Sequence, residues 1–167
     1  MDYNNYEGIL RYAMHVELDG EQNYKEHAER SNNPTTKRLF LNLSNMEKDH
    51  YDYLKRQLDY YLEDKGFKLD DEFIEREENI FLERQEVEKM DATIRESHMP
   101  DISALRTAYL VERDFKEFYE KASRNVEDKQ LSKVFERLAK WEEGHETMLK
   151  NEYDRRMKEY MDLPWGG

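Results

Sequence analysis

Two Glu-x-x-His pairs are the residues of this 167-residue chain whose spacing points most directly to chemistry. Glu47 precedes His50 by three residues, and Glu142 precedes His145 by the same distance. Residues three apart on a helix share one face, so each pair can present a carboxylate and an imidazole to one metal ion. A lone glutamate stands thirty residues before each pair: Glu17 and Glu112. This pattern predicts a carboxylate-bridged dinuclear metal site inside a four-helix bundle.

The positions of these residues strengthen the metal hypothesis. All six fall on apolar stripes of the expected helices, where leucine would be the ordinary choice. Burying an ionised carboxylate without a partner costs several kcal/mol, and four of them would also repel one another. Two divalent cations would cancel the charge of four carboxylates, with neutral imidazoles as the remaining ligands. Mixed oxygen and imidazole ligands favour two iron ions, with manganese or a mixed iron–zinc pair as alternatives.

Periodic apolar positions predict four long helices that hold these residues. The segments run from about 4–30, from 34 to about 64, from 101 to a turn near Glu127, and from there to about 160. Pro34 suits a first helical turn, Asp101 is the expected cap of the third helix, and Gly66 ends the second. Within each antiparallel hairpin, the lone glutamate and its Glu-x-x-His pair lie equally far from the turn. They should therefore lie level with one another.

The chain is predicted to be a single all-α domain over residues 1–167. It consists of two helical hairpins, at about 4–64 and 101–160, joined by a crossover at about 65–100. The crossover contains a predicted short helix at about 71–87. Four long helices with one long central connection are the ferritin-type arrangement of the bundle.

The two hairpins are copies of one pattern. Shifting the first by 95 residues superposes it on the second without a gap. The matched pairs include Leu10 with Leu105, Val16 with Val111, Glu17 with Glu112, Tyr24 with Tyr119, Phe40 with Phe135, Leu43 with Leu138, Glu47 with Glu142, His50 with His145 and Leu54 with Leu149. This repeat predicts that a pseudo-twofold axis relates the two hairpins.

The composition of the chain excludes several classes of partner and of binding site. Charged residues make up 40% of the chain and the net charge is −12, which argues against nucleic acid and against an anionic membrane surface. There is no cysteine, so disulfides and thiolate metal sites are excluded. No apolar stretch resembles a signal peptide or approaches the length of a membrane span, and we expect the cytoplasm.

Four segments carry a resemblance to a known family. VELDGEQNYKEHAE and LVERDFKEFYEKA each hold a glutamate followed by a tyrosine seven residues later, and EKDH and EEGH complete the set. Over almost its whole length the chain resembles the ferritin-like superfamily, and within it the rubrerythrin-like branch. The resemblance implies that Glu17, Glu47, His50, Glu112, Glu142 and His145 are the metal ligands, with Glu47 and Glu142 bridging. It also implies that Tyr24 and Tyr119 hydrogen-bond to ligand carboxylates, although their spacing fits ordinary core tyrosines equally well.

The chain departs from the rubrerythrin pattern in two places. Rubrerythrins usually carry a second glutamate three residues after the ligand of the third helix, and one iron moves onto it during the redox cycle. Phe115 stands at that position here, and Gly20 stands at the equivalent position of the first repeat. The rubredoxin-type domain with its four cysteines is also missing. The resemblance therefore implies an external electron-donor protein, and it implies a homodimer.

These observations favour a non-haem dinuclear oxidoreductase, a rubrerythrin-like enzyme that reduces hydrogen peroxide or dioxygen in defence against oxidative stress. Tyr24 or Tyr119 would supply a hydrogen bond or a proton. A ferroxidase or iron-handling protein is the main alternative, since the acidic surface would attract cations. A quinone-directed dimetal hydroxylase and a non-enzymatic helical protein with a structural metal are the others. An apolar membrane-facing surface would mark the hydroxylase, and a lack of redox turnover would mark the structural protein.

Overall fold

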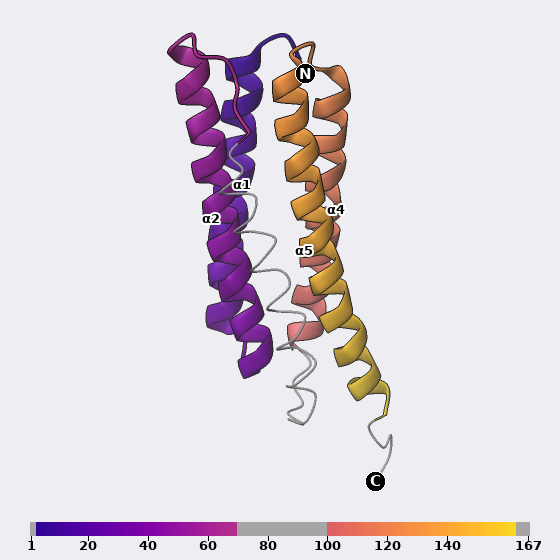
Figure 1. Ribbon diagram of the computed structural model, residues 1–167. Helices are drawn as coiled ribbons and strands as arrows, with labels where there is room; N and C mark the ends of the chain where they lie inside the picture. Colours follow the sequence, from indigo (N-terminus) through magenta and orange to yellow (C-terminus); the bar gives the residue numbers. More distant parts are fainter. Residues whose placement is uncertain (1–2, 70–99, 163–167) are drawn as a thin grey trace.

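The computed structural model describes residues 3–69 and 100–162, and within these residues every regular element is a helix (Figure 1). The helices are α1 (Tyr6–Arg30), α2 (Pro34–Leu62), α4 (Pro100–Asn125) and α5 (Lys129–Met161). The predicted all-α four-helix bundle is confirmed. The predicted short helix at about 71–87 lies outside the described residues. None of the described helices combines the length and the apolarity needed to cross a membrane.

Side-chain caps explain where the helices begin. Asn5 accepts a hydrogen bond from the backbone N–H of Gly8, and Asn33 accepts one from Thr36. Asp128 accepts two, from the N–H groups of Gln130 and Leu131. Such caps satisfy N–H groups that have no partner within the helix. Pro34 follows Asn33 in the first turn of α2, where its missing N–H costs nothing.

The helices pair as two antiparallel hairpins, α1 with α2 and α4 with α5 (Figure 1). Short turns at residues 31–33 and 126–128 close them. Beyond α2 the chain turns through Asp64 and Gly66, both with positive φ. The two hairpins lie side by side so that α1 and α4 run in opposite directions, as do α2 and α5 (Figure 1). This arrangement brings the two repeats face to face.

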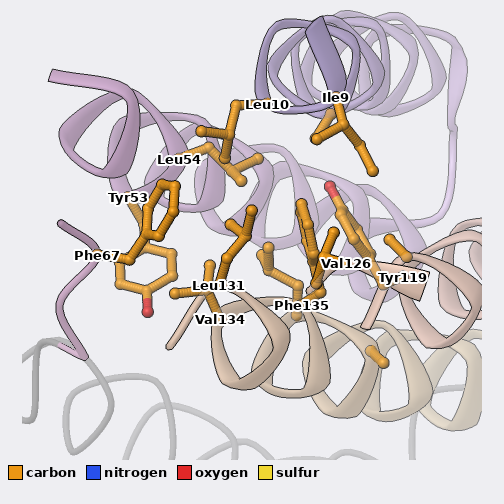
Figure 2. Packing of buried hydrophobic residues seen from close by; sticks show 14 of the residues in the cluster. Ile9, Leu10, Tyr53, Leu54, Phe67, Tyr119, Val126, Leu131, Val134 and Phe135 are labelled. Atoms are coloured by element: carbon orange, nitrogen blue, oxygen red, sulfur yellow. The ribbon is translucent and has the colours of Figure 1, made fainter. Parts of the chain in front are cut away.

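Two apolar clusters fill the bundle, one towards each end. Figure 2 shows the first, in which Leu10, Leu54, Leu131 and Phe135 pack together with other buried side chains. The second contains side chains from all four helices, including Tyr24, Phe40, Leu43, Leu105 and Leu149. Glu17, Glu47, Glu112 and Glu142 belong to neither cluster, although each is fully buried. Along the helices they fall between the two clusters, so apolar packing flanks the polar site at both ends.

A buried polar network joins the hairpins near the turn at residues 31–33. The hydroxyl of Thr36 donates to Glu152, and Arg156 donates to both of these side chains. The hydroxyl of Ser31 donates to Asp101 across the same end of the bundle. The prediction that Asp101 caps α4 is wrong, because Asp101 lies within the helix and a cap lies just outside it. Its carboxylate instead faces the turn of the other hairpin.

Candidate metal centre

The structure brings the six candidate ligands together in the middle of the bundle, with side chains that are at most 1% exposed. Each helix contributes to the site: α1 carries Glu17, α4 carries Glu112, and α2 and α5 carry the two Glu-x-x-His pairs. One potential ligand atom from each of Glu47, His50, Glu142 and His145 lies within 4.8 Å of the others. The role of all six as ligands stays a prediction, but their convergence is a property of the fold.

Carboxylates from three helices surround Nδ1 of His50. The nearest is Oε1 of Glu142 at 3.2 Å, from the opposite hairpin. Oε2 of Glu17 lies at 3.4 Å and Oε2 of Glu47 at 3.5 Å, both from the same hairpin as His50. These atoms outline a first metal position, with one imidazole and three carboxylates around it.

The second repeat reproduces this arrangement around Nδ1 of His145. Oε1 of Glu47 and Oε2 of Glu142 each lie at 3.1 Å, and Oε2 of Glu112 lies at 3.5 Å. The two imidazole rings stack almost parallel, with centroids 5.1 Å apart and planes 6° from one another. The pseudo-twofold relation of the sequence repeat is therefore present in the geometry of the site.

Glu47 and Glu142 occupy the positions that bridging carboxylates require. One oxygen of each faces His50 and the other oxygen faces His145. Glu17 and Glu112 differ, because each has an oxygen near one histidine and receives a phenol on the other oxygen. The geometry therefore separates two carboxylates that face both histidines from two that face one histidine each.

The residues fit a pair of cations, because many of their polar atoms are otherwise unsatisfied. Both oxygens of Glu47 and of Glu142, and Oε2 of Glu17 and of Glu112, are buried without a hydrogen-bond partner among the described residues. A buried acceptor without a partner carries the full cost of its lost hydration. Six such oxygens beside two imidazoles form a donor set for hard to borderline divalent metals.

The pKa shifts show how the site behaves without cations. Burial and neighbouring carboxylates raise the pKa of Glu17 and of Glu112 well above the usual range. Burial acts in the same direction on Glu47 and Glu142, yet the facing histidines hold the pKa of both below that range. The metal-free site therefore ionises some of its carboxyls and keeps protons on others. Protons then stand in for the positive charge that metal ions would provide.

Two tyrosines connect the hairpins through the terminal carboxylates. Tyr24 of α1 donates to Oε1 of Glu112 on α4, and Tyr119 of α4 donates to Oε1 of Glu17 on α1. Burial and the adjacent carboxylates raise the pKa of both phenols, so they keep their protons at neutral pH. The sequence resemblance implied such hydrogen bonds, and the structure adds that each one crosses to the other hairpin.

The repeat-related positions Gly20 and Phe115 lie close together beside the site. A Cβ atom on Gly20 would come within 3.3 Å of Cγ of Glu47 and 3.7 Å of Cε2 of Phe115. Glycine at this position therefore lets Glu47 and the aromatic ring approach the α1 backbone. Phe115 offers no ligand atom, so this side of the site is lined by hydrocarbon.

Sequence reasoning missed one neighbour of the site, Trp141. Its indole stacks on the imidazole of His50, with ring centroids 4.9 Å apart and planes 16° from one another. Trp141 directly precedes Glu142 in the chain, and no motif marks it. The stacking depends on how α5 lies against α2, which helical periodicity alone does not specify.

The fold and the site together define a carboxylate–histidine bundle protein with a place for two metal ions. Residues 8–153 match the rubrerythrin family, and the chain belongs to that family. The solved structure of a hypothetical protein from Pyrococcus furiosus is similar, with a TM-score of 0.66 and 21% sequence identity over 92% of this chain and 91% of that one. This second likeness concerns the fold alone. Among curated proteins, none matches the chain significantly.

Proposed function

We propose that the protein is a non-haem dinuclear oxidoreductase that uses two iron ions to reduce hydrogen peroxide or dioxygen in defence against oxidative stress. The facing pair Glu47 and Glu142 is the observation that supports this most. Each carboxylate reaches both histidines at distances of 3.1–3.5 Å, so Glu47 and Glu142 could each serve both metal positions. Two ferrous ions held there would supply two electrons, the number needed to cleave the O–O bond of hydrogen peroxide.

The chain's own residues would position the metals and hold protons. Burial of all four carboxylates keeps bulk water from the site and strengthens their attraction for cations. Reduction of hydrogen peroxide to two water molecules consumes two protons as well as two electrons. Tyr24 and Tyr119 each hold a proton at Oη next to a terminal carboxylate, one on each side of the site. They are our candidates for the proton donors.

Phe115 separates this proposal from the usual rubrerythrin cycle. No carboxylate stands at position 115, so the six-residue ligand set offers no alternative oxygen there for a metal to move onto. We therefore propose turnover at fixed metal positions. Because the chain contains no cysteine for an iron–sulfur site of its own, the electrons would come from a separate donor protein.

The test begins with metal analysis of protein purified without chelator, by inductively coupled plasma mass spectrometry. The metal-loaded protein is then reduced anaerobically and mixed in a stopped-flow instrument with hydrogen peroxide or with dioxygen. We expect two iron ions per chain, oxidised much faster by peroxide than by dioxygen. Glu142→Ala should remove this response. Glu143→Ala is the matched control, because the neighbouring Glu143 side chain is 64% exposed and contacts Lys116 instead of the site.

The other outcomes separate the alternatives. Faster reaction with dioxygen, together with continued oxidation of added ferrous ion, would support a ferroxidase, which the net charge of −12 would suit by attracting cations. Zinc alone, or no metal and no redox response, would contradict the oxidoreductase proposal. It would favour a structural role for the bundle.

A further inference from the structure

Trp141 belongs to an aromatic contact chain that begins at the candidate metal site. The indole stacks on His50, and the ring of Tyr53 meets the indole edge-on with centroids 5.5 Å apart. The guanidinium of Arg56, a half-buried residue, lies 6.0 Å from the centroid of the Tyr53 ring. The contacts therefore run from a candidate ligand through two buried aromatic rings to a charged residue that reaches solvent.

The repeat shows that packing alone does not require these rings. The 95-residue shift places Met46 at the position of Trp141, and Met148 at the position of Tyr53. Both methionines are also buried, at 4% and 3% exposure. The two repeats keep the same residue at all six candidate ligands and at both tyrosines that donate to them. They differ at the two positions that supply the aromatic rings of this contact chain, Trp141 against His50 and Tyr53 against Trp141.

Stacked aromatic rings conduct electrons better than saturated side chains, because their π orbitals overlap and their electrons are held less tightly. When no proton is lost, indole gives up an electron more easily than the other aromatic side chains. A ring in face-to-face contact with a ligand imidazole is therefore well coupled electronically to the metal that the imidazole binds. The contact also orients His50, as groups around metal ligands commonly do. The experiment below distinguishes these two roles.

We propose that Trp141 is the residue through which electrons reach the candidate metal site, at the position formed by His50 and Glu17. This inference rests on the proposed oxidoreductase function. Reduction of one hydrogen peroxide molecule consumes two electrons and two protons. A one-electron donor, such as a reduced iron–sulfur or flavin protein, returns the electrons in two successive transfers. Each transfer through Trp141 moves one electron and no atoms.

The decisive experiment measures reduction of the site without any peroxide. Full-length protein loaded with ferric iron is mixed anaerobically with the methyl viologen radical, and the loss of ferric absorption is followed. We expect Trp141→Leu to slow this reduction by about an order of magnitude while keeping two iron ions. Trp141→Phe keeps a ring on His50 and should be intermediate. Met46→Leu, at the repeat-related position, is the matched control and should react at the wild-type rate.

A second readout does not depend on reduction rates. In a Trp165→Phe variant, Trp141 is the one remaining tryptophan of the chain. Loading with ferric iron should quench its fluorescence, whereas loading with zinc, which accepts no electron, should leave most of the emission. Equal emission in the two loaded forms would contradict close electronic coupling between the indole and the metal.

The results distinguish a failure of the Trp141 inference from a failure of the proposed oxidoreductase function. An unchanged reduction rate in iron-loaded Trp141→Leu would overturn this inference and leave the proposed oxidoreductase intact. Loss of one iron ion from Trp141→Leu, with normal reduction of the other, would show that the indole merely orients His50, and would also overturn it. A wild-type chain that binds no iron would overturn both proposals together.

Discussion

Tyr119 on α4 donates its phenolic hydrogen to the carboxylate of Glu17 on α1, so each hairpin holds a candidate ligand of the other. The partner contact, from Tyr24 to Glu112, repeats this relationship on the opposite side of the pseudo-twofold axis. A tyrosine two helical turns beyond a glutamate of its own helix is too distant to reach it. Because α1 and α4 are antiparallel, the same tyrosine lies level with the glutamate of the other helix.

Removing one of these phenols should weaken metal binding more than it weakens the fold. Tyr119→Phe leaves Oε1 of Glu17 without its donor, and loss of a contact that orients a ligand typically lowers metal affinity about 10- to 100-fold. We expect this loss in a competition titration with a fluorescent chelator. Tyr109→Phe, on the same helix, is the control and should bind metal normally. Equal affinities in the two variants would contradict the assigned role of Tyr119.

Glu17 and Glu47 should differ in how many metal ions depend on them. Glu17 faces His50 alone, whereas Glu47 faces both histidines. Glu17→Ala should therefore lose one metal ion per chain, and Glu47→Ala should lower occupancy at both positions. Mass spectrometry of the metal content measures the difference. Full occupancy by two ions in Glu47→Ala would show that the bridging assignment is wrong.

Metal removal should make stability fall as the pH rises above mild acidity. Burial and neighbouring carboxylates raise the pKa of Glu17 and Glu112 above the ordinary value of 4.5. Burial by itself would lower the pKa of His50 and His145, but the surrounding carboxylates raise it above 6.5. These groups bind protons more tightly in the folded chain than in the unfolded chain. Their stabilisation is complete at low pH and is lost as the pH rises through their folded pKa values.

Glu47 and Glu142 act in the opposite sense, because their pKa values are lower in the folded chain than the ordinary 4.5. Their ionised carboxylates stabilise the fold above pH 4.5, and this stabilisation is lost as the pH falls through the lowered pKa values. Metal-free protein should thus be most stable at mildly acidic pH. Metal replaces the protons, so the increase in Tm on metal loading should grow between about pH 5 and about pH 8. Calorimetry of both forms tests this. A metal-free Tm that rises across the same interval would contradict it.

Gly20→Ala should separate fold stability from metal affinity. Alanine favours a helix interior over glycine by about 1 kcal/mol. The new methyl group would lie 3.3 Å from Cγ of Glu47, so that side chain must move by a few tenths of an ångström. Two metal ions bound to both oxygens of Glu47 would oppose this movement, whereas in the metal-free chain no such bonds hold the side chain. Chemical denaturation of the metal-free variant should give a free energy of unfolding equal to or greater than that of the wild type. A metal titration should show that the variant binds metal more weakly.

Asp128→Ala should lower the stability of the fold without changing metal binding. Asp128 caps α5 by accepting hydrogen bonds from two backbone N–H groups, and loss of such a cap costs about 1 kcal/mol. Chemical denaturation should show this decrease in the free energy of unfolding, with metal content unchanged. Reduced metal content in the folded variant would show that the helix start and the site are coupled.

The helices could be predicted from sequence because their apolar stripes recur with helical period, and the observed ends lie within two residues of those expected for α1, α2 and α5. The convergence of the six polar residues followed from the same stripes and from the exact repeat. The capping role of Asp101 was predicted wrongly, because Asp101 lies inside α4 and its carboxylate accepts a hydrogen bond across the bundle from Ser31. The stack of Trp141 on His50 was also missed, since it depends on how α5 of one hairpin lies against α2 of the other, which the helical period of each segment does not specify.

The gapless repeat has a consequence for the history of the site. Each hairpin carries one histidine, one bridging glutamate and one terminal glutamate, together with the tyrosine that serves the other half. Two copies of a single ancestral hairpin, paired about a true twofold axis, would already assemble a complete site with identical halves. Within one chain the two halves need not be identical. Trp141 stands opposite Met46 and Phe115 stands opposite Gly20, so the two candidate metal positions have the same predicted ligands and different surroundings.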